Sequence, residues 1–489
     1  MNLNDPAIVP NGWGFFLIAW ITCRLMGVLF AIHSVWRQNR PQSALGWAMA
    51  LVTLPVLAIP AYLILNGSSK FRSYTHLLRA SNGEINHQFI KDFEGLTHLE
   101  KHKIEELGLG TLRNVVHLPI TAGNKCKLLV NGRETYSCIF DMISRAKKYI
   151  LLEYFAVAND SLGIALANRL LAAADTGVKV YFIRDEIGSL GLKGRFHRAL
   201  NDHPNIIFKE FGTTRKANVF QINFRNHRKL VIVDGIEAAT GGLNATREYI
   251  VDEWRDTHMW ITGPAVAPLQ ICFIEDFFWA TDAAVPELNW QYDPRREPRT
   301  KLKGVIANCE ILSIPSSPAD GLPTNNIYFS QMIYAAKKRI WMTAPYFFPS
   351  ESVQTALTVA AIRGVDVRII IPRKSDNQLT NLSAWAVFPR MIQAGVQIYL
   401  YREIMVHQKV FLVDDELSSI GSANLDNRSI FLMFELCQAV VNKAFNREVE
   451  AMLINDMKSC DLITLHDIDS LSRWKTFFVH LATLWGPIL

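Results

Sequence analysis

The chain has 489 residues, which is too long for one ordinary hydrophobic core, so we expect two or more domains. Its formal net charge of +6 fits an anionic partner, either lipid or nucleic acid, without choosing between them. The seven cysteines are scattered and form no C-x-x-C pair, which argues against a structural zinc site and a disulfide framework and favours a reducing compartment.

Two long apolar segments lie near the amino terminus. The first, Trp13–Ala31, carries Arg24 as its one charge, and the second, Leu45–Leu65, carries none. Each is long enough to cross a bilayer as a helix. We therefore predict a membrane hairpin over residues 1–69, with two transmembrane helices at about 13–35 and 45–66 and both ends on one side. A signal peptide is disfavoured because the leader has Asp5 and no Lys or Arg.

Several residues of this hairpin leave questions open. Arg24 near the middle of the first span is costly unless it faces protein or water or snorkels, so a functional and a merely tolerated Arg are both open. Pro55 and Pro60 are expected to kink the second span rather than end it. The connecting turn carries two arginines (Arg37, Arg40) and the downstream flank three cations (Lys70, Arg72, Arg79). This small bias favours a cytoplasmic catalytic part.

The rest of the chain contains two matching halves after a linker at residues 70–120, in which 100–106 has the charge pattern of a solvated helix. The segment Ala146–Ile150 matches Ala336–Ile340. In both halves a helix-like segment (134–148, 326–338) precedes an apolar strand (149–155, 339–344), and a second helix-like segment (161–176, 351–363) ends at a glycine. This alternation predicts an α/β fold with two repeats, at 121–285 and 304–489, joined by a linker at 286–303.

One motif occurs once in each half. It begins at His227 and at His407, and in both cases Lys follows at +2 (Lys229, Lys409), Asp at +7 (Asp234, Asp414), Gly at +14 and Asn at +17 (Asn244, Asn424). A single His-x-Lys is a weak signal, but five matched positions occurring twice are not a chance pattern.

The motif spacing places its polar groups on a β-hairpin. His and Lys at i and i+2 of a strand point to one face. The following strand returns and brings the Asn amide back beside the His. Asp234 and Asp414 complete the catalytic motif, but they lie at the far end of the strand, where a structural role in buried hydrogen bonds is favoured over substrate contact.

Two His, two Lys and two Asn in one cleft suit a phosphate diester. Ammonium and amide groups donate to the non-bridging oxygens, where transition-state charge collects. One neutral His attacks phosphorus, and the other protonates the leaving alcohol and then deprotonates the incoming one. No ligand set with metal spacing accompanies these residues, so we expect neither a metal nor another cofactor.

Two acids are candidates for orienting the histidines. Asp256 follows Asn244 by twelve residues and Glu435 follows Asn424 by eleven. A carboxylate on the far imidazole nitrogen fixes the tautomer and stabilises the imidazolium. An ordinary salt bridge is the alternative, and the sequence leaves open which acid serves which His.

These motifs resemble those of bacterial cardiolipin synthases in the phospholipase D superfamily, and the similarity covers essentially the whole chain. The segments that carry the resemblance are the duplicated motif, Asp185–Ser189, Asn226–Lys229, Trp254–His258, Ala344–Pro349, Asn424–Ser429 and the membrane-hairpin segment Leu45–Ala48. The resemblance implies two phospholipase D-like α/β repeats that form one pseudo-twofold catalytic unit.

The resemblance also implies a reaction and its residue roles. A phosphatidyl group passes from one phosphatidylglycerol to another at the bacterial inner membrane, in a multi-pass protein. His227 is the nucleophile and His407 the acid/base, the Lys and Asn residues bind phosphate, and Asp256 and Glu435 support the histidines. Met433 departs from the Asn of many relatives, which puts a polar contact from this position in doubt.

Other interpretations stay open on sequence alone. The same intermediate resolved by water gives a phospholipase D that releases phosphatidic acid, and phosphatidylethanolamine is an alternative donor. A nuclease is disfavoured by the membrane segments, so we expect no nucleic-acid partner. A membrane-anchored lipid-binding protein is the non-enzymatic rival. The tail from Arg473 to Trp485 mixes aromatic and cationic residues, as interfacial helices do, but it also fits a packed terminal helix. Self-association is undetermined.

Overall fold

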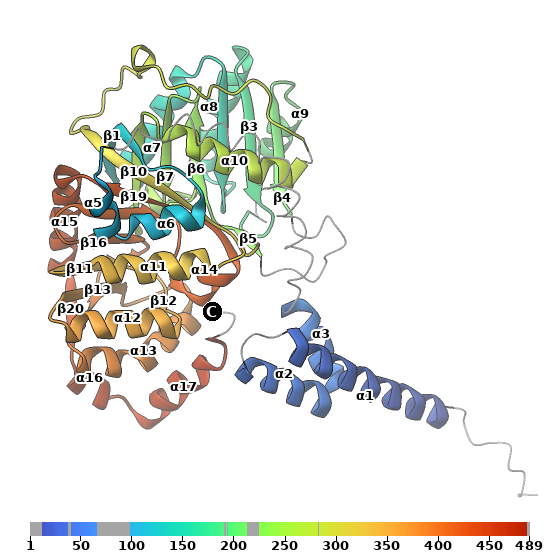
Figure 1. Cartoon of the computed structure of the whole chain (residues 1–489). Coiled ribbons are helices and arrows are strands. Elements are labelled where there is room, and N and C mark those ends of the chain that lie inside the picture. The colour runs from blue at the N-terminus through green and yellow to red at the C-terminus, as the bar shows by residue number, and fades with distance from the viewer. Residues whose placement is uncertain are drawn as a thin grey trace, which may run out of the picture. The chain divides into compact units, whose positions relative to one another are not determined.

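The computed structural model describes residues 12–37, 41–65, 98–189, 192, 194–212, 224–281 and 283–486. The chain divides into two compact units. The smaller contains the helices α1 (Gly12–Arg37), α2 (Pro41–Thr53) and α3 (Pro55–Leu65), and the larger contains every element from α5 onward (Figure 1).

In the small unit only one of the two predicted spans is a continuous helix. Helix α1 has 26 residues and is the one helix in the described part of the chain that is long and apolar enough to cross a membrane. The second predicted span is divided at Leu54 into α2, of 13 residues, and α3, of 11 residues. The prediction of a second spanning helix over 45–66 is therefore wrong, because Pro55 ends α2 instead of only kinking it. Pro60 lies inside α3.

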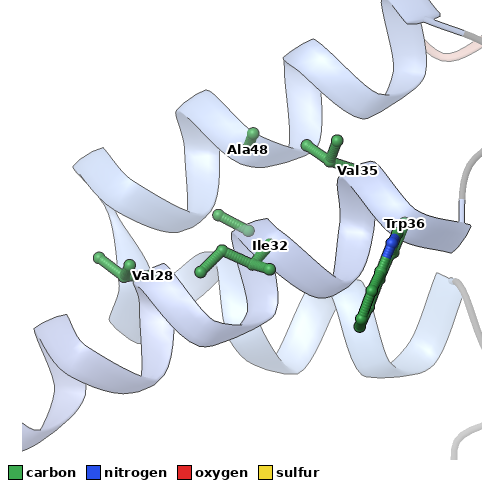
Figure 2. Close-up of a pocket in the computed structure, with 6 residues that line it drawn as sticks. Val28, Ile32, Val35, Trp36 and Ala48 are labelled. Carbon is green, nitrogen blue, oxygen red and sulfur yellow. The ribbon is translucent and has the colours of Figure 1, made fainter.

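Helix α3 folds back onto α2. The rings of Trp47 and Tyr62 are 5.2 Å apart, although 15 residues of straight helix would separate them by about 22 Å. The Tyr62 hydroxyl also lies 2.8 Å from His33 Nδ1, near the end of α1. At the bend, Gly27 lets α1 approach closely, since a Cβ there would lie 2.3 Å from the Leu51 carbonyl oxygen. An apolar groove between α1 and α2 is lined by residues that include Val28, Ile32, Val35, Trp36 and Ala48 (Figure 2).

The large unit is built on one sheet of 16 strands whose two halves mirror each other. The order runs β20-β14-β13-β11-β16-β17-β19-β10 and continues β1-β9-β7-β6-β2-β3-β4, with β5 paired to β19. Strands β1 (Thr121–Val130) and β10 (Ile306–Ser316) are antiparallel neighbours at the centre. The motif strand β6 (Lys229–Val233) lies between β2 (Tyr149–Tyr154) and the returning strand β7 (Glu237–Gly241). In the second repeat, β16 (Val410–Val413) lies between β11 (Arg339–Thr343) and the returning strand β17 (Leu417–Gly421).

The remaining helices and strands that the halves share follow the same order, and the second half has additional elements, which include β12, β20, α16 and α17. The first half contains α7 (Asn131–Arg145), β2 (Tyr149–Tyr154), α8 (Ser161–Asp175), β3 (Lys179–Asp185), α9 (Arg195–Asp202), β4 (Ile206–Phe211), β5 (Arg225–Asn226), β7 (Glu237–Gly241), η1 (Arg247–Tyr249), β8 (Trp254–Arg255), β9 (Thr257–Thr262) and α10 (Val266–Thr281). After η2 (Pro294–Arg296), the second half contains α11 (Thr324–Ala335), β11 (Arg339–Thr343), β12 (Phe347–Phe348), α12 (Glu351–Ile362), β13 (Asp366–Pro372), α13 (Gln378–Gln393), β14 (Gln397–Tyr401), β15 (Met405–Val406), β17 (Leu417–Gly421), β18 (Leu425–Asp426), α14 (Asn427–Phe431), β19 (Met433–Val441), α15 (Lys443–Lys458), β20 (Cys460–Ile463), α16 (Leu465–Asp469) and α17 (Arg473–Thr483).

The α/β fold is confirmed, and the paired helices and strands of both repeats lie within a few residues of their predicted bounds. The predicted linker differs. Within it, α5 (Lys101–Glu106) and α6 (Leu109–Val116) contribute Ile104, Leu109 and Leu112 to the apolar core of the second half. This part of the linker belongs to the large unit, because its apolar residues are buried against the second repeat.

Candidate active site

The two repeats exchange short strands just before each motif histidine. Strand β5 of the first repeat pairs with the start of β19 in the second, and β15 of the second pairs with β8 of the first. The exchange continues through each histidine: His227 N donates to Phe434 O at 2.9 Å, and His407 N donates to Arg255 O at 2.7 Å. Each histidine is thereby held beside the acid that follows its backbone partner in the other repeat.

The histidine–acid pairs cross between the repeats. His227 Nδ1 lies 3.0 Å from both carboxyl oxygens of Glu435, and His407 Nδ1 lies 2.7 Å from Asp256 Oδ2. All four side chains are buried. In each pair the far nitrogen, Nε2, remains for substrate, as a nucleophile or a proton donor requires.

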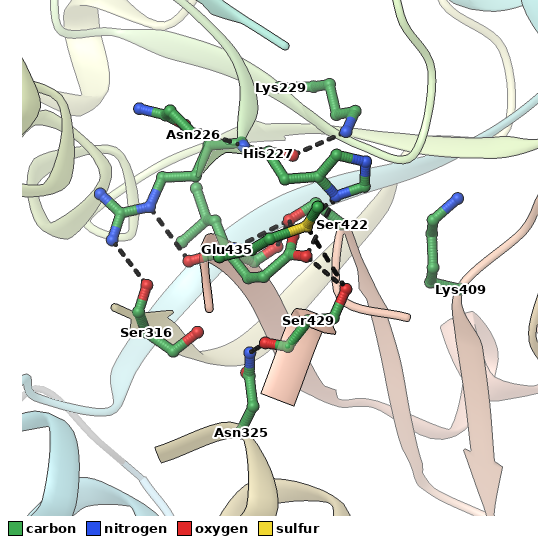
Figure 3. A network of polar contacts seen from close by, with 12 residues as sticks. Asn226, His227, Lys229, Ser316, Asn325, Lys409, Ser422, Ser429 and Glu435 are labelled. Carbon is green, nitrogen blue, oxygen red and sulfur yellow. Dashed lines mark hydrogen bonds and ion pairs between the residues drawn. The ribbon is translucent and has the colours of Figure 1, made fainter. Parts of the chain in front are cut away.

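The surroundings of the two acids differ. Glu435 accepts hydrogen bonds from Ser422 Oγ at 2.5 Å and from Ser429 Oγ at 2.7 Å (Figure 3). Asp256 lies against Gly242, the counterpart of Ser422, where a Cβ would come within 2.2 Å of Asp256 Oδ1. The shorter acid approaches its histidine closely because this position has no side chain.

The motif lysines and asparagines surround the histidines. Lys229 Nζ donates to His227 O at 2.6 Å, and Lys409 Nζ lies 3.2 Å from His407 Nε2. The Asn244 side-chain oxygen accepts from Ala156 N at 3.2 Å, while Asn424 Oδ1 is buried without a hydrogen-bond partner among the described residues. Two ammonium groups and two amides thus lie where they can donate to a phosphate held between the rings.

Both histidines open into one cavity of about 460 Å³. That volume lies in the usual range for small-molecule sites. The lining comes from both repeats and includes Phe155, His227, Asn244, Glu248, Trp254, Tyr346, Asp376, His407, Asn424, Arg428 and Met433. Met433 contributes an apolar surface to this lining.

Burial and the crowded positive charges set the protonation of the site. Burial, followed by the charges of Lys229 and Lys409, lowers the pKa of His227 well below its usual value. Burial and Lys409 lower the pKa of His407 to about 4, although Asp256 opposes them. Burial also lowers the pKa of Lys409 to about 8. Both imidazoles are therefore neutral at pH 7 in the empty cavity. A bound phosphate anion adds a negative charge that favours an imidazolium, and His407 beside Asp256 is the histidine better placed to take up that proton.

The pKa values of the two acids are shifted in opposite directions. Burial raises the pKa of Glu435 to about 8, although Lys229 opposes it. For Asp256 burial also favours the neutral form, but the charge of Lys409 and the hydrogen bond to His407 outweigh it, so the pKa is lowered. These shifts favour the carboxylate form of Asp256 and the protonated form of Glu435 at neutral pH.

The two motif aspartates lie away from this cavity. The Asp234 carboxylate accepts from the backbone N–H groups of Lys147, Lys148 and Tyr149 at 2.7–2.9 Å. Asp414 accepts in the same way from residues 337–339. Both therefore fix the start of a neighbouring strand, which is the structural role that their place at the strand end favours, and they do not join the catalytic groups.

Sequence reasoning missed further polar residues of the site. The Tyr249 hydroxyl lies 3.1 Å from His407 Nδ1, and Ser429 bonds to Glu435. Both residues follow their motif Asn by five positions. A comparison of the two repeats could have identified this shared position, but Tyr and Ser do not look alike in the sequence. No group of three or more His, Cys, Asp or Glu residues suited to a metal occurs in the described part of the chain.

Comparison with known proteins agrees with this architecture. Residues 139–272 and 329–457 match the family described as cardiolipin synthase, PLD-like domain. The chain is 37% identical to cardiolipin synthase A of Pseudomonas putida (strain W619) over 95% of this chain and 96% of the relative, and 37% identical to cardiolipin synthase A of Pseudomonas syringae pv. syringae (strain B728a) over 100% of both.

A solved structure shares the fold. The crystal structure of phosphatidylserine synthase from Haemophilus influenzae Rd KW20 superposes with a TM-score of 0.60 at 17% identity, and the match covers 78% of this chain and 100% of that one. The duplicated family match, the full-length identity and the crossed histidine–acid pairs lead to one conclusion: the chain belongs to the cardiolipin synthase family of the phospholipase D superfamily.

Proposed function

We propose that this cavity transfers a phosphatidyl group from one phosphatidylglycerol to the headgroup hydroxyl of another, giving cardiolipin and glycerol through a phosphohistidine. The observation that carries the proposal is that two histidines from separate repeats, each oriented by a carboxyl group of the other repeat, open into one cavity. Two imidazoles on one diester match the needs of a double displacement at phosphorus.

In the first step His227 Nε2 attacks phosphorus and the bond to the headgroup glycerol breaks. His407 donates its proton to that leaving oxygen. In the second step the hydroxyl of another phosphatidylglycerol returns a proton to His407 and attacks phosphorus, and the phosphorus–nitrogen bond breaks. Lys229, Lys409, Asn244 and Asn424 donate to the non-bridging oxygens as charge develops there.

The acids support this division of roles. Ionised Asp256 stabilises an imidazolium at His407, as a proton donor requires. Glu435 keeps its proton at neutral pH because its pKa is raised, so it does not favour protonation of His227, which must be neutral to attack. The assignment of His227 as nucleophile therefore has a physical basis besides family resemblance.

The membrane context fits lipid substrates. Helix α1 is long and apolar enough to anchor the protein in a bilayer. Helix α17 turns an apolar stripe to solvent, with Trp474, Phe477 and Leu484 at least half exposed, while Val479 and Ala482 face the protein. This orientation favours the interfacial interpretation of the tail over that of a fully packed helix.

Product analysis tests the proposal. Purified full-length protein is incubated with phosphatidylglycerol in mixed micelles, and the lipid products and glycerol are quantified. We expect cardiolipin and glycerol in equal amounts, whereas phosphatidic acid as the main product would favour the hydrolase. Absence of any turnover would leave the lipid-binding alternative, and adding phosphatidylethanolamine tests it as a second donor.

A further inference from the structure

The two repeats present opposite charges at one equivalent position of the cavity. Glu248 follows Asn244 by four residues, and Arg428 follows Asn424 by four. The next residue in each segment, Tyr249 of η1 or Ser429 of α14, contacts a histidine–acid pair, which shows that the two segments are structurally equivalent. Glu248 and Arg428 both line the cavity, so its walls are not symmetric in charge.

Neither charge is paired at contact distance by a described residue, although one acid of the same cavity is influenced by Arg428: burial raises the pKa of Asp426 to about 6, and the charge of Arg428 opposes that rise. Of the described residues, none forms an ion pair with Glu248 or with Arg428, and both side chains are half-buried. Glu248 Oε2 and Arg428 Nε are buried with no hydrogen-bond partner there. A guanidinium that is partly removed from water without an ion-pair partner is destabilising, so we expect an anionic group of a ligand at Arg428.

Arg428 lies within electrostatic reach of the reacting groups. Burial lowers the pKa of His227 most, and the positive charges of Lys229, Lys409, His407 and Arg428 lower it further. Burial raises the pKa of Tyr346, and Arg428 opposes that rise. The Tyr346 ring is 6.0 Å from the His407 ring, and Tyr346 and Arg428 both line the cavity.

We propose that Arg428 binds the phosphate of the acceptor phospholipid, as a second anion site beside the one that holds the reacting diester. This inference rests on the proposed transfer. An acceptor phosphatidylglycerol places its free hydroxyl at His407, and its own phosphate, one glycerol unit away, at Arg428. Its hydroxyl proton passes to His407 while the new phosphorus–oxygen bond replaces the phosphorus–nitrogen bond. Water and free glycerol have no phosphate and gain nothing from Arg428.

Competition between two acceptors tests this site. The full-length protein is given phosphatidylglycerol with labelled glycerol, and three products are measured: cardiolipin, labelled phosphatidylglycerol from exchange, and phosphatidic acid. Loss of one charge-assisted contact lowers acceptor use by roughly ten- to a hundredfold. In Arg428→Gln we therefore expect cardiolipin to fall by that factor relative to glycerol exchange, and Arg428→Lys to recover part of the loss.

The matched control is Glu248→Gln at the equivalent position, which should not lower the ratio of cardiolipin to exchange. An equal fall of cardiolipin, exchange and hydrolysis in Arg428→Gln would show that the residue serves the reacting diester or the fold, and would overturn the acceptor site. A wild-type protein that makes no cardiolipin would instead overturn the proposed function and this inference with it.

A second inference comes from the small unit. At about 1.5 Å per residue, α1 extends about 39 Å, whereas α2 and α3 extend only about 20 Å and 17 Å, short of the roughly 30 Å hydrocarbon layer. Because Tyr62 of α3 contacts both Trp47 and His33, the end of α3 returns toward the end of α1. The apolar α2–α3 segment therefore enters the bilayer and leaves it on the same side.

Arg24 stabilises the bend. Pro55 has no N–H to donate to the carbonyls at the end of α2, and such groups are costly in hydrocarbon. Arg24 Nη1 donates to Val52 O at 2.7 Å, which places a cation at the negative end of the α2 dipole. Arg24, the one charged residue of the first span, thus caps the carboxyl end of α2 at the bend.

We infer that α2–α3 is a re-entrant hairpin and that the amino terminus lies across the membrane from the large unit. The basic flanks Arg37, Arg40, Lys70, Arg72 and Arg79 then share one side, while residues 1–11 carry only Asp5. With all five cations on one side, the positive-inside rule places that side, and the catalytic unit, in the cytoplasm.

Cysteine labelling tests this topology. Asn4→Cys and Ser68→Cys are made separately in the full-length protein, and sealed right-side-out vesicles are treated with an impermeant maleimide, with the unsubstituted protein as background. We expect labelling at position 4 only, and at position 68 only after permeabilisation. The same pattern at both positions, whether both are labelled before permeabilisation or both only after it, would restore the two-span hairpin and overturn the inference.

Discussion

At the scale of single residues, the two histidines have the same sequence motif but different electrostatic surroundings. Ionised Asp256 contacts His407, and protonated Glu435 contacts His227. The difference depends on burial and on nearby ammonium groups, which a motif does not encode. It determines which imidazole is suited to hold a proton.

A donor with a good leaving group separates the two roles. With phosphatidyl-p-nitrophenol, departure of the phenolate needs no proton, so His407→Ala should still release nitrophenol in a single burst. His227→Ala should not, because nothing replaces the nucleophile. With phosphatidylglycerol both variants should lose activity, by about 10²–10⁴-fold for the acid. Stopped-flow absorbance measures the burst, and a burst in His227→Ala alone would reverse the assignment.

The pH dependence of kcat/KM reports on Lys409. Its pKa is about 8 in the free enzyme because burial disfavours the charged form. The ammonium is the form that stabilises a phosphate, so activity should be lost as pH rises through about 8. In Lys409→Arg the guanidinium stays protonated, and this alkaline limb should move to higher pH even if the rate is lower. An unchanged limb would show that another group titrates there.

At the scale of secondary-structure elements, the strand exchange between repeats positions the chemistry. Strands β5 and β15 each pair with the other repeat, so the acid that supports a histidine is never in that histidine's own half. The motif aspartates act at the same scale, because each joins its motif hairpin to the start of the neighbouring strand.

Replacing Asp234 should therefore affect stability more than catalysis. Asp234→Ala removes the acceptor of three backbone N–H groups and should lower the free energy of unfolding by about 1–3 kcal/mol. The folded fraction should keep most of its kcat. Asp415→Ala is the control and should change stability little, because the Asp415 side chain is 54% exposed. Thermal unfolding in detergent checks both variants, and loss of kcat with unchanged stability would return Asp234 to the catalytic groups.

Most helices and strands of the two repeats could be predicted from the sequence. The duplicated Ala-Lys-Lys segments and the glycines after α8 and α12 placed strands and helices within a few residues. The bend at Pro55 could not be predicted, because an uninterrupted apolar segment has the same composition in a straight and a folded-back helix. The contact between Trp47 and Tyr62 depends on tertiary packing alone.

Because Arg24 caps the bend between α2 and α3, its replacement should change the membrane topology. Arg24→Leu leaves the Val52 carbonyl without its donor, so we expect labelling of Ser68→Cys to become mixed between the two sides, while Arg24→Lys keeps the wild-type pattern. The impermeant-maleimide assay measures this. An unchanged pattern in Arg24→Leu would mean that packing around Gly27 is sufficient for the bend.

At the scale of the whole molecule, duplication produces one active site from two repeats. The mirrored sheet brings β1 and β10 together at its centre, and each repeat supplies one motif His and one motif Asn to the lining of the shared cavity, with one Lys and one acid in contact with the histidines. The sequence predicted this set of groups, but not the crossed pairing, because the exchange strands of two residues each carry no periodic signal. Because Glu248 and Arg428 occupy equivalent positions of η1 and α14, these two segments differ in charge.

Trapping the covalent intermediate tests this centre most directly. The protein is mixed with phosphatidylglycerol labelled in its phosphate, quenched in alkaline denaturant within its first turnovers, digested and analysed by mass spectrometry. We predict an acid-labile phosphatidyl adduct on the peptide that contains His227, absent from His227→Ala. An adduct on His407, or turnover to cardiolipin with no adduct on either histidine, would contradict the mechanism.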